Sequence, residues 1–143
     1  MNYLLKKVLS KISSSSVILG FFIFILFAGT TPVLPITGWE APASADKLKN
    51  PLQGNNKATL EGKKLFNMYC SPCHGNKGKG DGIAGMSLKP RPTNLTSKTV
   101  QAQTDGAIFW KITEGRPPMA SYKDALPENQ RWQMVNFIRD LAK

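Results

Sequence analysis

The chain has 143 residues, a formal net charge of +10 at pH 7, two cysteines and a single histidine. This length suffices for one small domain and a tail. With only three Cys and His side chains, a zinc site built from four such ligands is excluded.

The N-terminal segment, residues 1–38, has the pattern of a signal or membrane anchor. Three lysines precede an apolar stretch from Val17 to Ala28, which are the charged and apolar regions of an export signal. Extended to Ile36, the stretch has 20 residues, about 30 Å as a helix and enough for a bilayer core. We therefore expect an N-terminal apolar helix.

Two outcomes of export stay open. Ala43-Ser44-Ala45 has the form of a cleavage site, but it lies farther from the apolar stretch than such sites usually do, which favours an uncleaved anchor. The positive-inside rule keeps the lysines in the cytoplasm and places everything after Trp39 outside. We expect a protein of the bacterial cytoplasmic membrane with its folded part on the periplasmic face. The alternative is a soluble periplasmic protein after cleavage.

Residues 39–56 are rich in Ala, Pro, Asn and Lys, with Pro42, Pro51 and Gly54 interrupting any periodicity. This composition predicts a flexible linker. The folded domain is then residues 57–143. Its first helix is predicted from about Thr59 to Ser71, with Thr59 or Asn56 as its cap.

The next segment, Cys70-Ser71-Pro72-Cys73-His74, contains both cysteines and the histidine. C-x-x-C-H is the attachment signature of c-type haem, in which two thiols hold the porphyrin and the imidazole binds the iron. A thioredoxin-like dithiol would instead follow a strand in a βαβ pattern, and no strand pattern precedes the motif. We predict one covalent haem c per chain, bound by Cys70, Cys73 and His74.

The rest of the domain reads as a loop and two helices. Residues 75–92 hold five glycines and two prolines, which predicts a loop whose backbone passes close to a porphyrin edge. A second helix is predicted over 105–113, capped by Thr104 or Asp105 and ended by Gly115. The last helix is predicted from Pro127 through Leu141. No strand pattern is found, so the domain is predicted to be all-α.

A six-coordinate haem iron needs a ligand opposite His74, and His74 is the only histidine. Methionine or lysine must therefore serve, or the position is open, and methionine is the expected partner of histidine. Met119 follows two prolines in the loop between the last two helices, and proline stiffening would hold its side chain in place. Met86, in the glycine loop, is the alternative. Met68 lies on the proximal side, and Met134 has the position of a core residue.

Together these motifs resemble the class I cytochromes c, and the resemblance covers residues 57–143. It implies a cytochrome c fold wrapped around one covalent haem. It also implies that the first and last helices cross with Gly62 and Phe66 against Phe137 or Trp132, which would explain a costly glycine inside a helix. In that family a proline carbonyl orients the proximal imidazole, which assigns the role to Pro90 or Pro92.

Filled axial positions predict an electron carrier and not an enzyme, since oxygen or peroxide chemistry needs an open distal position. A haem enzyme with an open distal site is the competing hypothesis. A basic surface near the motif predicts redox partners with acidic docking surfaces, and nucleic acid is not expected. The resemblance extends to subunits of respiratory complexes, so the chain is also a candidate subunit of a quinol-oxidising or terminal oxidase complex.

Overall fold

The computed structural model describes residues 38–143, and the predicted N-terminal helix lies outside these residues. Within them, no helix is long and apolar enough to cross a membrane. The elements in chain order are η1 (Ala45–Lys47), α3 (Asn56–Tyr69), α4 (Ser71–His74), η2 (Ile83–Gly85), α5 (Lys98–Gln101), α6 (Asp105–Glu114) and α7 (Glu128–Asp140). The described part contains no strand, which confirms the all-α prediction there.

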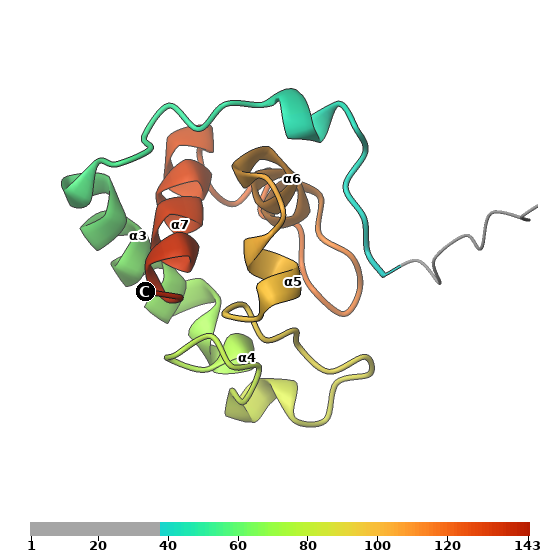
Figure 1. Cartoon of the computed structure of the whole chain (residues 1–143). Helices are drawn as coiled ribbons and strands as arrows, with labels where there is room; N and C mark the ends of the chain where they lie inside the picture. The colour runs from blue at the N-terminus through green and yellow to red at the C-terminus, as the bar shows by residue number, and fades with distance from the viewer. Residues whose placement is uncertain (1–37) are drawn as a thin grey trace, which may run out of the picture. The chain divides into compact units, whose positions relative to one another are not determined.

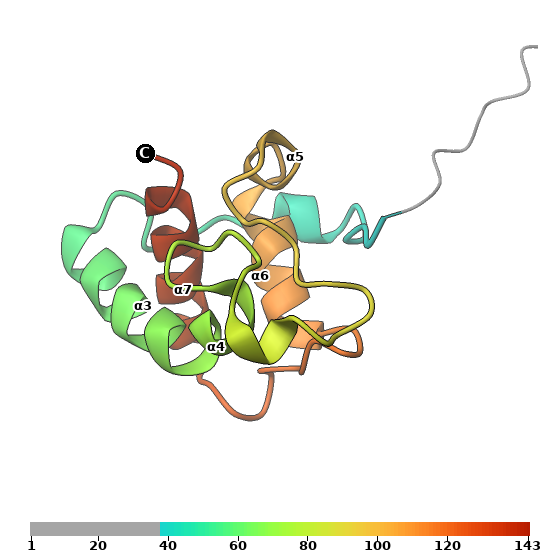
Figure 2. The same ribbon diagram turned by 90° about the horizontal axis from the view of Figure 1, so that it is seen from below.

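The core is organised around α7, which lies between α3 and α6 (Figure 1 and Figure 2). A side chain at Gly62 of α3 would overlap the backbone carbonyl of Gln133 in α7. The Phe66 and Phe137 rings meet edge to face beside this crossing, with centroids 5.2 Å apart. The predicted crossing is therefore confirmed with Phe137. Trp132 instead stacks on Phe109 of α6, with 3.9 Å between centroids.

The helix boundaries follow local capping. Helix α6 begins after Thr104, whose Oγ1 accepts a hydrogen bond from the Ala107 backbone at 3.0 Å, and it ends at Gly115, as predicted. Helix α3 begins three residues before the predicted start, because Asn55 is the cap: its Oδ1 accepts from Ala58 N at 3.0 Å. Helix α5 was not predicted, and Ser97 caps it in the same way. Short polar helices of this kind have no apolar periodicity to detect.

The residues predicted as a linker pack on the domain instead. We call residues 39–52 the N-terminal strap; it runs along α7 and α6 (Figure 1). The Asn50 amide donates to Asp105 of α6 and to Asn136 of α7, each at 2.8 Å. The Leu52 carbonyl accepts a hydrogen bond from Asn136 at 2.6 Å. These contacts fix the strap to two helices.

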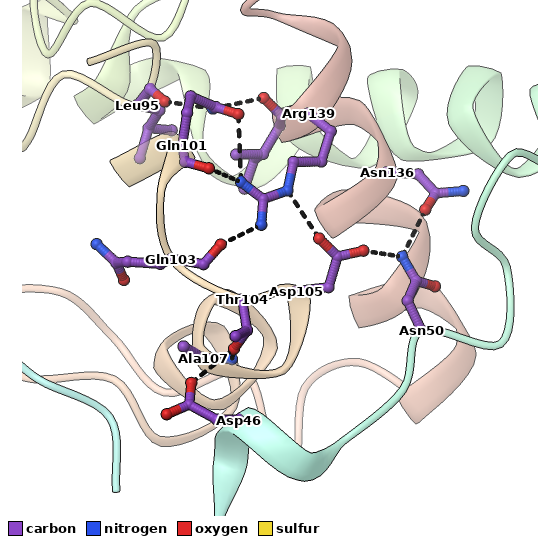
Figure 3. A network of polar contacts seen from close by, with 11 residues as sticks. Asp46, Asn50, Leu95, Gln101, Gln103, Thr104, Asp105, Ala107, Asn136 and Arg139 are labelled. Carbon is purple, nitrogen blue, oxygen red and sulfur yellow. Dashed lines mark hydrogen bonds and ion pairs between the residues drawn. The ribbon is translucent and has the colours of Figure 1, made fainter. Parts of the chain in front are cut away.

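The same network ties α5, α6 and α7 together (Figure 3). Arg139 of α7 forms an ion pair with Asp105, with 2.7 Å between Nε and Oδ1, and both side chains are largely buried. Its guanidinium also donates to the backbone carbonyls of Gln101 and Gln103. One arginine thus satisfies the carbonyl of the last residue of α5 and a carbonyl in the connection between α5 and α6.

Candidate functional site

The Cys70–His74 motif forms its own helical turn. Helix α3 ends at Tyr69, and the carbonyl of Cys70 accepts hydrogen bonds from the amides of Cys73 (3.1 Å) and His74 (2.8 Å). Both thiols are free and half-buried. Cys70 is thereby held at the cap of this turn, and Cys73 and His74 at its last two positions.

The His74 ring is oriented by a backbone acceptor. Its Nδ1 lies 3.0 Å from the carbonyl oxygen of Thr93. A carbonyl can only accept, so Nδ1 carries the proton and Nε2 keeps the lone pair that binds a metal. Burial lowers the pKa of His74, while the bond to Thr93 acts in the opposite direction.

The resemblance to class I cytochromes c implied a proline carbonyl, that of Pro90 or Pro92, in this orienting role, and the structure has the Thr93 carbonyl there instead. The carbonyl of Pro92 is turned toward Gly80, where an added side chain would collide with it. The next carbonyl along the chain, that of Thr93, therefore faces the imidazole.

The glycines of the loop pack against the motif itself. The Gly82 amide donates to the Cys73 carbonyl at 3.1 Å. A Cβ at Gly85 would lie 2.6 Å from the same oxygen. Gly82 and Gly85 thus lie against the backbone of α4, and the predicted approach of this loop to a porphyrin edge stays a prediction. These two glycines let the loop from residue 75 to 92 seat against the motif.

The surroundings of the Cys70 thiol do not favour disulfide exchange. Burial, followed by the charge of Cys73, raises the pKa of the Cys70 thiol to about 12. A dithiol oxidoreductase needs the opposite, a thiolate at neutral pH. The environment of Cys70 therefore argues against that activity.

The four methionines after Met1 have distinct environments. Met134 is fully buried in the core, as predicted, while Met68 and Met86 are 66% and 56% exposed. Met119 is half-buried and closes a tight hairpin with Arg116, whose backbone it pairs with at 2.8 and 3.0 Å.

The base of this hairpin is fixed on α6. Gly115 has a φ of 66°, and a Cβ there would lie 2.5 Å from Ser121 N. The Ser121 hydroxyl donates to the Thr113 carbonyl at 2.6 Å. The Met119 hairpin is thus a defined structure and not a loose connection.

One residue near the motif, Tyr122, was not predicted from the sequence. Tyr122 follows the hairpin, donates to the Tyr69 carbonyl at 2.9 Å, and packs against the core, as does Cys70. Burial, together with the nearby cysteines, raises its pKa to about 12. Its place beside the motif depends on the fold, and no spacing rule in the sequence could have found it.

The surface around the glycine loop combines positive charge with exposed apolar side chains. Ile83 is 85% exposed and Met86 is also exposed. The exposed basic residues in this loop are Lys77, Lys79, Lys89 and Arg91, and two more, Arg116 and Lys123, are exposed in and after the Met119 hairpin.

The donor set fits a c-type haem. It offers two free thiols in C-x-x-C spacing and an imidazole whose Nε2 is available, and these are the groups that such a haem requires. Among residues 38–143, no three His, Cys, Asp or Glu side chains gather as a site for a free metal ion. The thiols and the imidazole therefore fit a c-type haem.

Comparison with known proteins agrees with this chemistry. Residues 57–138 match the family described as cytochrome c oxidase, cbb3-type, subunit III. A cytochrome c6-like protein of Nostoc sp. is 27% identical over 92 residues, which make up 62% of this chain and 76% of that protein.

Among solved structures, the fold is shared with a chain of the reducing HAO-like protein complex of Kuenenia stuttgartiensis. The TM-score is 0.59 at 23% identity, over 68% of this chain. Only 49% of the Kuenenia chain is matched, so the present chain spans about half the length of that relative.

Proposed function

This chain belongs to the family of cbb3-type cytochrome c oxidase subunit III, whose cytochrome c domains bind haem c covalently. From this premise we propose that it is a one-electron carrier. The observation that carries the proposal is the His74 ring, whose Nδ1 is bonded to the Thr93 carbonyl while both adjacent thiols are free. This arrangement presents Nε2 as the proximal ligand and two sulfurs for attachment.

In this proposal each residue has one task. Cys70 and Cys73 hold the haem through thioether bonds, His74 is the proximal ligand, and Met119 is the distal ligand. The bound haem supplies a reversible ferric and ferrous couple. The Met119 thioether favours the ferrous form, and the buried apolar core beside Cys70 disfavours the additional charge of the ferric form.

If His74 and Met119 both bound the iron, the haem would supply one-electron chemistry and would leave no open position for oxygen or peroxide. This supports a carrier over the competing haem enzyme. The choice between carrier and enzyme depends on whether Met119 binds the iron, so that ligand assignment is the one to test.

Substitution of Met119 tests the ligand assignment. Met119→Ala should remove the near-infrared absorption that marks a thioether bound to ferric haem, and should lower the reduction potential. Met86→Ala, the matched control at an exposed methionine, should leave both unchanged. A pyridine haemochrome assay of the wild type should show one covalent haem. If Met119→Ala keeps the near-infrared absorption, another methionine such as Met86 is the ligand; if the wild type itself lacks that absorption, the open-site enzyme is favoured.

We also infer that redox partners present acidic docking surfaces. The exposed lysines and arginines around the glycine loop support this, because opposite charge speeds encounter. A subunit of a quinol-oxidising or terminal oxidase complex would supply such a partner. The rate of electron exchange with an acidic cytochrome partner should fall as the salt concentration rises. Lys89→Gln should make this dependence of the rate on salt less steep. A rate independent of salt would contradict the assignment.

For location we propose the bacterial cytoplasmic membrane, with the haem domain on the periplasmic face. The lysines and the apolar stretch before Ile36 support this proposal. Membrane fractionation with N-terminal sequencing tests it. A mature chain that began at Asp46 and was recovered in the soluble periplasm would establish the cleaved alternative.

A further inference from the structure

Trp39, the first large side chain of the strap, sits among side chains of α6 and the Met119 hairpin. Its ring lies 6.3 Å from the Trp110 ring, centroid to centroid. The Arg116 guanidinium lies 5.3 Å from its centroid, and the Lys111 ammonium 5.9 Å. Two cations thus lie within the distance at which a tryptophan ring attracts them.

Arg116 is one side of the Met119 hairpin. Its backbone N–H donates to the Met119 carbonyl at 3.0 Å, and its carbonyl accepts from the Met119 amide at 2.8 Å. If Met119 is the ligand opposite His74, a backbone movement that withdraws it from the iron would have to shift or break these two hydrogen bonds. The guanidinium held on Trp39 therefore restrains the backbone next to Met119.

The strap can hold Trp39 because it is itself anchored farther along. The backbone of Ala45 and Leu48 lies directly on Gly106, where a Cβ would be 2.9 Å from the Leu48 carbonyl oxygen. Asp46 accepts a hydrogen bond from the Thr104 hydroxyl at 2.7 Å, a contact that Figure 3 shows beside the Asn50 contacts. Trp39 is thus attached to α6 through the chain as well as through its ring.

We propose that Trp39 is a positioning residue that keeps the Met119 hairpin closed by clamping Arg116. The inference rests on the proposed ligation by Met119 and adds a control element that lies outside the matched cytochrome domain, residues 57–138. It also predicts that removal of the N-terminal signal would change the haem site. Cleavage after Ala45 would remove Trp39 and leave a haem whose distal ligand dissociates more readily.

Competition with imidazole measures hairpin opening in the full-length, haem-loaded ferric protein. Imidazole can bind only when Met119 has left, so its apparent affinity rises with the open fraction. Trp39→Ala removes both cation contacts, and we expect imidazole to bind about tenfold more tightly. Trp39→Phe, which keeps a ring for Arg116, should recover most of the difference.

Two further variants separate the clamp from general destabilisation. Val100→Ala opens the buried core at a residue of α5 that is neither in the strap nor in the hairpin. It should lower the free energy of unfolding while leaving imidazole affinity near that of the wild type. Arg116→Met should reproduce the effect of Trp39→Ala, and the double variant should add little to either, since the two residues act as a pair.

The outcomes distinguish this inference from the proposed function. If Met119→Ala keeps the near-infrared absorption, the ligand assignment fails and the clamp fails with it. If Met119→Ala loses that absorption but Trp39→Ala binds imidazole like the wild type, only the clamp is overturned. Equal gains in imidazole affinity for Trp39→Ala and Val100→Ala would likewise overturn it.

Discussion

The crossing of α3 and α7 leaves no room for a side chain at Gly62, and Gly62→Ala measures how much the fold depends on it. The added methyl would overlap the Gln133 carbonyl, which is backbone inside a helix and cannot rotate away. The two helices would have to separate. Phe66, which is fully buried beside the crossing, would lose contact with Phe137.

The expected size of the effect combines two opposing contributions. Overpacking against an immobile neighbour costs about 3 kcal/mol. Alanine is the better helix former by about 1 kcal/mol, which offsets part of that cost. The net loss is about 2 kcal/mol. In a domain of about 100 residues, this lowers Tm by roughly 8 to 16 °C.

Thermal unfolding of the haem-loaded protein, followed by far-ultraviolet circular dichroism, is the assay. Lys63→Ala is the control, because Lys63 neighbours Gly62 in α3 but is exposed. It should change Tm by little. If Gly62→Ala unfolded at or above the wild-type Tm, the helices would not be in backbone contact at Gly62 and the reasoning would fail.

Three other substitutions test separate parts of the fold. Thr104→Ala removes the cap of α6 and the contact with Asp46, and should cost about 1 to 2 kcal/mol in denaturant unfolding, with Thr104→Ser recovering most of it. Arg139→Met leaves Asp105 without its ion-pair partner, and should cost about 2 kcal/mol by the same measurement, whereas a loss below 0.5 kcal/mol would mean that solvent replaces the pair. Burial raises the pKa of Tyr122 to about 12 from the ordinary 10, so its neutral phenol stabilises the fold fully below pH 10, and this contribution is lost as the pH rises through 12. Ultraviolet titration should therefore show one late phenolate that Tyr122→Phe lacks; an unchanged titration would contradict the assignment.

Features that depend on one short segment of the chain could be predicted from the sequence. Thr104 and Gly115 mark the two ends of α6, and the expected helix matches the observed one almost residue for residue. Gly62 indicated a close crossing because a glycine inside a helix needs a reason. The Cys70–His74 motif indicated its chemistry because all of its ligands are contiguous.

Contacts between distant segments were not predictable in this way. The strap was read as a linker because its prolines and polar residues break every periodicity. Its order comes from partners far along the chain, such as Gly106 under Ala45 and Asp105 beside Asn50. Thr93 was missed for a related reason, because which carbonyl of an irregular loop faces His74 depends on how that loop seats against α4.

The acceptor that orients His74 is a main-chain oxygen, 19 residues along the chain. Every amino acid at position 93 carries the same carbonyl, so substitutions there cannot remove the acceptor. What this interaction does require is the length of the intervening loop, because one residue more or fewer would bring a different carbonyl, or none, to the imidazole. Deletions and insertions between Gly82 and Thr93 should therefore damage the iron site more than changes at exposed side chains in the same segment, and libraries that vary this loop should keep its length together with Gly82 and Gly85, which lie against the motif backbone.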